Sequence, residues 1–191
     1  VDKGRKRIDC SNKFPEYTCA YYFMNYLKKN GIECTEGAGD YKLDTDWEPK
    51  GEVRILGKTY SPTLDRIIFE TNHASNNLYA ETLLRGLSLE MTGSACYDSA
   101  YVALGDIFKE LGVELKGADI QDGSGLSRQN YISPDFICDF LEAMAGTEVC
   151  GEFVQSLPSP GFNGSLNYNM RGYPATFRSR IKVKSGSMNG V

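Results

Sequence analysis

Apolar side chains recur at helical spacing in five separate stretches of the chain, each bounded by residues that start or stop helices. Such a stripe buries one face of a helix and leaves the other in water, so every helix needs a neighbour to cover it. Gly31 and Gly112 follow two of the stripes, at positions where a helix can end in a left-handed residue. The spacing predicts helices over residues 15–30, 63–71, 77–90 and 98–111, and a fifth from Ser133 onward.

The fifth stretch carries the strongest start signal. Ser133, Pro134 and Asp135 place a hydroxyl at the cap, a proline at the first helical position and an acid in the first turn. The buried stripe of this helix is predicted to consist of Ile137, Phe140, Leu141 and Met144.

Three short stretches, residues 53–56, 117–122 and 180–188, indicate strands, so we predict an α+β fold with a helical cluster packed on an antiparallel sheet. Asn189 and Gly190 are a strong hairpin signal, yet the sequence ends one residue later. A hairpin without its return strand leaves an open sheet edge. We therefore expect a piece of a longer protein. Pairing of two such edges in a dimer is a hypothesis that sedimentation would test.

Charge and hydropathy exclude several kinds of partner. The net charge of the 191 residues is −4, so no basic field favours nucleic acid. Charged residues interrupt the apolar stretches well before the roughly 18 residues that a membrane-spanning helix requires. We expect neither a nucleic-acid partner nor a transmembrane segment.

Cysteine and histidine limit the chemistry of the chain. The six cysteines show no metal-site spacing, and those in apolar helical stretches are expected to be small buried hydrophobes. We therefore predict neither a metal nor a cofactor. Since His73 is the single histidine and no Gly-x-Ser-x-Gly motif lies near it, a serine mechanism would need a base other than histidine.

Ser75, Asn76 and Asn77 stand directly before a helical stripe. In a turn or extended conformation, residues two apart project to the same side, so Ser75 and Asn77 can both reach one cleft. The alternative is that these polar residues only cap the following helix.

Lys184, Ser185, Gly186 and Ser187 lie on the last predicted strand. The ammonium supplies a positive charge for a carboxylate, the hydroxyls add donors, and the glycine lets a ligand approach the backbone closely. The alternative is a solvated edge strand, on which lysine is a common guard against aggregation.

Together, the two clusters match two of the three signature motifs of serine penicillin-recognising enzymes. The stretches 75–85, 122–128 with 132–134, and 184–187 resemble the class C low-molecular-mass penicillin-binding proteins. These form the D-alanyl-D-alanine carboxypeptidase/endopeptidase family of the penicillin-binding protein 4 or DacB type. The resemblance is close over residues 61–191 and looser over 1–60, and it implies part of one transpeptidase-like (β-lactamase-like) domain.

The resemblance also implies roles for the motif residues. Ser75 would relay a proton toward the leaving amine, and Asn77 would bind the acyl-side amide of the substrate. Lys184 and Ser185 would hold the carboxylate of the terminal D-alanine. The backbone N–H of Ser187 would supply half of an oxyanion hole.

The sequence departs from the family pattern in two places. Asn76 stands where the family often has aspartate, and no Ser-x-x-Lys nucleophile motif precedes Ser75. The literal match from Ser179 to Lys182 adjoins the last predicted strand, where the two side chains would face opposite sides. We therefore predict that the chain alone is inactive. For the loop 122–127, structural and functional roles are both open.

By this resemblance, the parent enzyme would hydrolyse peptidoglycan stem peptides through an acyl-serine intermediate and would be acylated by β-lactams. It would work in the periplasm or cell envelope of a bacterium. One alternative is a non-catalytic peptidoglycan-binding module that retains this half of the cleft. A serine β-lactamase is the other, although Ala80 and Glu81 after the first motif fit the carboxypeptidases better.

Overall fold

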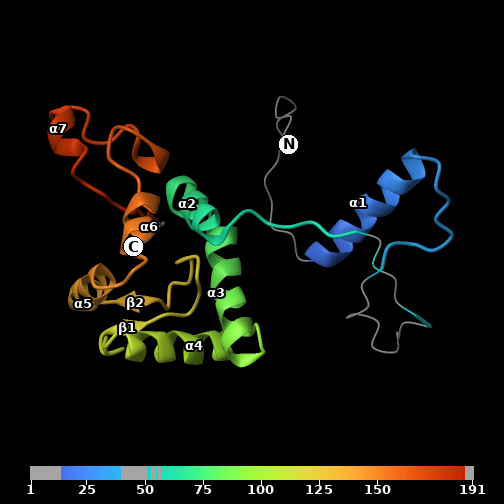
Figure 1. The fold of residues 1–191 in the computed structure, drawn as a ribbon, viewed down its shortest axis with the longest axis horizontal. Coiled ribbons are helices and arrows are strands. Elements are labelled where there is room, and N and C mark those ends of the chain that lie inside the picture. Colours follow the sequence, from blue (N-terminus) through green and yellow to red (C-terminus); the bar gives the residue numbers. More distant parts are fainter. Residues whose placement is uncertain (1–13, 40–50, 53–54, 56, 188–191) are drawn as a thin grey trace. The chain divides into compact units, whose positions relative to one another are not determined.

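The computed structural model describes residues 14–39, 51–52, 55 and 57–187. The chain divides into two units, residues 1–59 and 60–191. The first unit contains α1 (Pro15–Lys29), and the second contains the remaining elements that Figure 1 labels. These are α2 (Leu64–Ala74), α3 (Asn77–Thr92), α4 (Tyr97–Glu110), β1 (Ala118–Asp119), β2 (Tyr131–Ile132), α5 (Pro134–Ala145), α6 (Cys150–Ser156), the short 3₁₀ helix η1 (Gly164–Leu166) and α7 (Ala175–Arg178).

The predicted helices are confirmed, and their ends follow the glycine signals. Helix α1 is followed by Gly31 and α4 by Gly112, both with left-handed φ values of 78° and 73°. Helix α2 runs three residues beyond the predicted end at Thr71. Of the strand predicted at 53–56, Val53, Arg54 and Leu56 lie outside the described residues.

The core of the second unit forms where α4 packs against α5. Phe108 of α4 meets Phe136 and Phe140 of α5 edge to face, with ring centroids 5.1 and 5.9 Å apart. Phe108, Phe136 and Val113 are each at most 7% exposed, and partly buried apolar residues surround them. These residues join α4 to α5, with Phe140 as the member of the predicted α5 stripe that meets Phe108.

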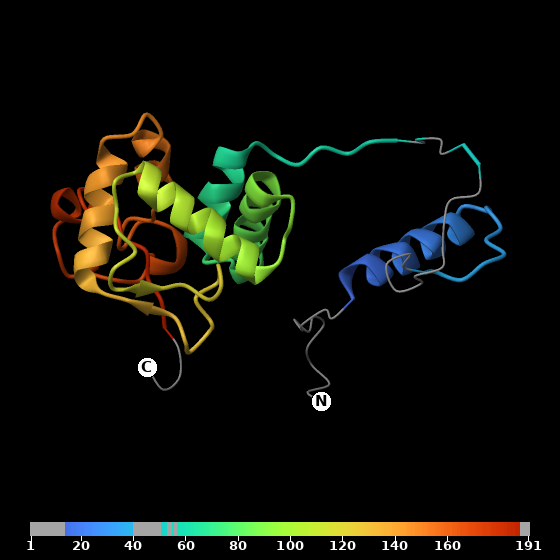
Figure 2. The same ribbon diagram turned by 90° about the horizontal axis from the view of Figure 1, so that it is seen from below.

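A two-stranded antiparallel sheet lies beside α4 and α5 in both views (Figure 1, Figure 2). Strand β1 falls within the predicted stretch 117–122 and pairs with β2, with Ala118 opposite Ile132. Strand β2 leads directly into α5, whose predicted cap is present because the Ser133 hydroxyl accepts a hydrogen bond from the Phe136 N–H at 3.2 Å. The predicted α+β class is therefore confirmed, with a sheet that is small.

Two details of the prediction are wrong. Ile137 and Leu141 are about half exposed, at 45% and 46%, because α5 turns Phe136 and Phe140 toward Phe108 instead. Residues 181–187 of the predicted last strand pair with no strand in the described structure. A strand exists only with a partner, which the alternating pattern of the sequence cannot supply. The predicted hairpin turn at Asn189 and Gly190 lies outside the described residues.

Gly123 gives a test of how closely the loop after β1 packs on α3. A Cβ at residue 123 would lie 2.6 Å from the Ala80 carbonyl oxygen and 2.9 Å from the Leu84 Cβ. Gly123→Ala should therefore lower the free energy of unfolding by about 1–3 kcal/mol. Gly86→Ala on the exposed face of α3, where nothing lies within 4 Å, should raise it by about 0.5–1 kcal/mol. Urea denaturation measures both, and equal effects would contradict the packing described.

Candidate active site

The first motif forms the junction between α2 and α3. Ser75 ends α2 with a left-handed φ of 52°, Asn76 is the N-cap residue of α3, and Asn77 is the first residue of that helix. The Asn76 side chain accepts a hydrogen bond from the Tyr79 N–H at 3.1 Å. Capping is thus the role of Asn76, and it leaves the side chains of Ser75 and Asn77, both exposed, for other contacts.

The structure brings the second motif to the first across 109 positions of sequence. The Lys184 ammonium donates to the Ser75 hydroxyl at 2.8 Å and to the Ser185 carbonyl oxygen at 2.6 Å. Both partners are neutral, and within the described residues Lys184 takes part in no ion pair. No described side chain therefore neutralises the positive charge, which is available to an anion.

Burial of the Lys184 ammonium lowers its pKa below the ordinary value, although much of the side chain is exposed. Loss of hydrating water weakens the charged form, and a bound carboxylate would offset that loss. This position therefore suits a lysine that has an anionic ligand as its partner.

Ser185, Gly186 and Ser187 follow Lys184 in the second motif. The Ser185 hydroxyl lies 3.5 Å from the hydroxyl of Ser165 in η1. Gly186 has open space where a Cβ would stand, and Ser187 is exposed. Lys184 thus contacts Ser75 at the end of α2, and Ser185 lies beside Ser165 of η1. The hydroxyls of these three serines form one small group. Asn77 makes no side-chain hydrogen bond within the described structure.

His73 has a packing role beneath this group. Its ring is buried and stacks on Phe69 at 3.8 Å, and its Nδ1 lies 3.2 Å from the Phe69 carbonyl oxygen. The other candidate nucleophile motif also fails, because Ser179 ends α7 and donates to the Thr176 carbonyl oxygen at 3.2 Å, while Lys182 follows in a non-helical segment. Neither a histidine base nor this Ser-x-x-Lys match forms a catalytic pair.

The cysteines differ from their prediction as buried hydrophobes. Cys19, Cys96 and Cys138 are exposed, because each lies on the outer face of its helix or at a helix start. Hydrogen bonds from the Ser94 and Ser99 side chains lower the pKa of the Cys96 thiol to about 7. In the described part of the chain, no group of three or more His, Cys, Asp or Glu side chains has metal-site geometry.

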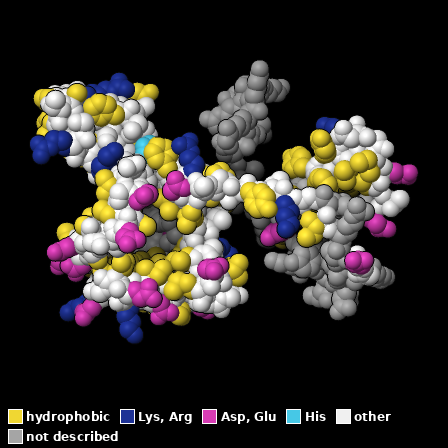
Figure 3. All heavy atoms as spheres, viewed as in Figure 1, with side chains coloured by type: hydrophobic (Ala, Val, Ile, Leu, Met, Phe, Trp, Pro, Cys, Tyr) yellow, Lys and Arg dark blue, Asp and Glu magenta, His cyan; other side chains and the backbone are white. Residues whose placement is uncertain are grey.

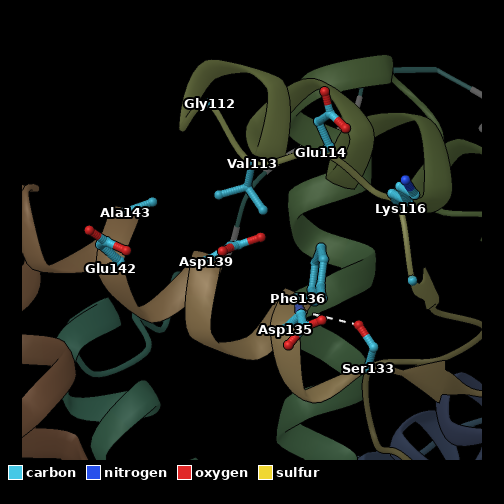
Figure 4. Close-up of a pocket in the computed structure, with 11 residues that line it drawn as sticks. Gly112, Val113, Glu114, Lys116, Ser133, Asp135, Phe136, Asp139, Glu142 and Ala143 are labelled. Atoms are coloured by element: carbon cyan, nitrogen blue, oxygen red, sulfur yellow. Dashed lines mark hydrogen bonds between the residues drawn. The ribbon is translucent and has the colours of Figure 1, made fainter.

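A hollow of about 750 Å³ lies between the loop after α4 and helix α5 (Figure 4). Four carboxylates line it, those of Glu114, Asp135, Asp139 and Glu142, beside Lys116. None of the motif residues lines this hollow. On the face in Figure 3, acidic side chains predominate over α4 and α5, whereas basic ones gather over the α7 part. The four carboxylates therefore disfavour an anionic ligand in this hollow, whereas the Lys184 ammonium attracts one.

Comparisons with known proteins identify the family and the fold. The family model of the D-Ala-D-Ala carboxypeptidase 3 (S13) peptidases matches residues 5–191. The chain belongs to this S13 family. Among the described residues, no helix has both the length and the apolar character to cross a bilayer.

Two S13-like relatives match nearly the whole chain. A D-alanyl-D-alanine carboxypeptidase of Actinomadura sp. (strain R39) is 29% identical over 182 residues, and a penicillin-sensitive carboxypeptidase A of Dictyostelium discoideum is 31% identical over 186 residues. Each match covers 93% of this chain and 33% of the relative. The chain therefore spans about a third of the length of these relatives.

Solved structures show the same fold. The crystal structure of penicillin binding protein 4 (dacB) from Haemophilus influenzae matches 90% of this chain and 37% of its own, with a TM-score of 0.76 and 24% identity. A complex of that protein with a novel β-lactam matches 83% of this chain and 36% of its own, with a TM-score of 0.69 and 22% identity. The fold of this chain is thus that of part of penicillin binding protein 4.

Sequence reasoning missed the residues that surround the motifs. Ser165, beside Ser185, and the hydrogen-bonded pair of Asn72 and Ser156 all belong to segments with no motif of their own. A local signal existed only at Gly164, whose φ of 62° suits a glycine at a tight contact.

The loop 122–127 owes its shape to its own hydrogen bonds. The Asp122 carboxylate accepts from the N–H groups of Gly125 and Ser127 at 2.7 and 2.8 Å and from the Asn130 amide at 3.0 Å. The Gly123 N–H donates to Glu81 of α3 at 3.0 Å. These contacts support a structural role for the loop.

Asp122 predicts a pH dependence of stability. Burial raises its pKa, but the hydrogen bonds from Asn130, Ser127 and Gly125 outweigh burial, so the pKa of Asp122 lies below its ordinary value. The carboxylate therefore stabilises the fold at neutral pH, and this contribution disappears as the pH falls through the folded-state pKa. Asp122→Asn should be destabilised at pH 7, and its difference from the wild type should shrink toward pH 3. Urea unfolding at both pH values checks this, with the exposed Asp106→Asn as control; a pH-independent loss would contradict it.

Proposed function

We propose that the chain carries the carboxylate-recognising half of the active site of a serine-type D-Ala-D-Ala carboxypeptidase or endopeptidase. The observation that carries this proposal is the 2.8 Å hydrogen bond between Lys184 and Ser75, which joins two distant polar motifs around a cation that no described side chain neutralises. Membership of the S13 family supports the reaction class.

In this proposal each motif residue has one role. The Lys184 ammonium and the Ser185 hydroxyl hold the terminal carboxylate of the substrate, and Asn77 binds its acyl-side amide. Ser75, already hydrogen-bonded to Lys184, relays a proton toward the leaving amine. The N–H of Ser187 supplies one oxyanion donor, an interaction worth about 3 kcal/mol in acyl transfer. The open space at Gly186 lets the substrate approach the backbone.

The substrate class follows from the same resemblance. We propose peptidoglycan stem peptides ending in D-alanyl-D-alanine, β-lactams as ligands of the same place, and the periplasm or cell envelope as location. Residues 1–191 would form part of one penicillin-binding domain, with residues 1–60 as its less similar leading segment.

A non-catalytic peptidoglycan-binding module is the second candidate. It is favoured if the full-length protein has no Ser-x-x-Lys motif before Ser75, as is the case within these 191 residues. Both candidates have the same carboxylate site. They differ in whether a serine nucleophile attacks the bound peptide.

Peptide binding tests the site that the two candidates share. An acetylated peptide ending in D-alanyl-D-alanine should bind the chain, and Lys184→Gln should weaken binding about tenfold because a charge-assisted contact is lost. Amidation of the peptide carboxylate should weaken binding to a similar extent, with no further loss in Lys184→Gln, since both changes remove one contact. Lys182→Gln, an exposed lysine two residues away, is the matched control for calorimetry. Equal losses in the two lysine variants would refute the assignment.

Covalent labelling tests the missing nucleophile. Because no Ser-x-x-Lys motif precedes Ser75 in the 191 residues, a fluorescent penicillin should give no covalent adduct with this chain, and the peptide should not be hydrolysed. Gel fluorescence and mass spectrometry check this result. An adduct on any serine of the chain would show that a nucleophile has been overlooked.

A further inference from the structure

We infer that Asn72 and Ser156 are positioning residues of this site, and that their hydrogen bond holds Ser75 within reach of Lys184. The part of the inference that concerns peptide affinity rests on the proposed function, whereas the part that concerns the Ser75–Lys184 contact does not. Both motif side chains are exposed, so water competes for their hydrogen bond, and fixing a lysine costs side-chain entropy. The backbone segments that carry the two residues must therefore be held together by other contacts.

The first of these contacts joins the ends of α2 and α6. The Asn72 amide donates to the Ser156 hydroxyl at 2.7 Å, one helical turn before Ser75. Ser156 is 1% exposed and donates its own proton to the Phe153 carbonyl oxygen at 2.7 Å. Since a hydroxyl has a single proton, Ser156 can only accept from Asn72. Within the described residues, this is the one hydrogen bond between α2 and α6.

The second contact joins α6 to the lysine motif. Pro158 stands two residues after Ser156 and is among the most deeply buried residues. Its carbonyl oxygen accepts a hydrogen bond from the Val183 N–H at 3.0 Å, directly before Lys184. Figure 1 shows the chain returning from α7 past α6 to make this contact. The segment 156–158 therefore holds both motifs, one through a side chain and the other through the backbone.

The helix η1 contacts both α2 and Pro158, and thereby completes the set of contacts around the two motifs. A Cβ at Gly164 would lie 2.9 Å from the His73 carbonyl oxygen and 2.9 Å from the Pro158 Cβ. Glycine here lets η1 enter the corner between α2 and Pro158, which puts Ser165 beside Ser185. Loss of the Asn72–Ser156 hydrogen bond removes the link between α2 and α6 that lies one turn before Ser75.

The test uses two readouts on the full chain. The first is the nuclear Overhauser effect between the Lys184 Hε and Ser75 Hβ protons without ligand, and the second is the affinity for the D-alanyl-D-alanine peptide. Asn72→Ala, Ser156→Ala and the double variant are compared. Ser88→Ala is the matched control, because Ser88 is also fully buried and donates to a backbone carbonyl, that of Ser94, at 2.7 Å.

We expect Asn72→Ala and Ser156→Ala each to lose the Overhauser effect and to weaken peptide binding about tenfold, and the double variant to be no worse than either. Ser88→Ala should keep both readouts whatever its melting temperature. Retention of the Overhauser effect in Asn72→Ala, or its equal loss in Ser88→Ala, would overturn the inference. If the wild type binds no peptide, the proposed function fails, and the Overhauser series still decides the positioning role. Should Ser156→Ala not fold, the half-buried Asn72→Ala alone gives the answer.

Discussion

Residue 164 lies so close to α2 and to Pro158 that no side chain fits there, and the arrangement of the site depends on this contact. A Cβ would lie 2.9 Å from both the His73 carbonyl oxygen and the Pro158 side chain. The buried ring of His73 stacks on Phe69 next to this contact. The place where α2, Pro158 and residue 164 meet is a tightly packed corner. Because the corner joins the segments that end in Ser75 and that hold Val183, its packing sets the distance between the two motifs.

Within the described part of the chain, neutral groups alone hold the Lys184 ammonium. Lys184 has neutral hydrogen-bond partners, whereas Arg66 and Arg85 are each paired with a glutamate one helical turn away. The hollow against α5 is lined by four carboxylates and one lysine. Electrostatics therefore favours an anion beside Lys184 over one in the hollow that the carboxylates line.

The helices could be predicted because their signals are local. The cap at Ser133 and the glycine after α4 act within one turn of the residues they specify. The last strand could not be predicted from alternation alone, since residues 181–187 have no strand partner among the described residues. The two motifs were found because their residue types resemble a family, whereas the pair Asn72 and Ser156 meets only through tertiary packing and leaves no sequence pattern.

At Ser75 the backbone conformation that the fold requires is unfavourable, whereas the side chain makes the contact with Lys184. Its left-handed backbone, with φ 52° and ψ 51°, disfavours every side chain that has a Cβ, by about 1–2 kcal/mol. Glycine would relax the turn between α2 and α3 but has no hydroxyl to meet the Lys184 ammonium. A substitution that stabilises the helix junction would therefore remove the hydroxyl that the lysine contacts, so stability and this contact make opposite demands on residue 75.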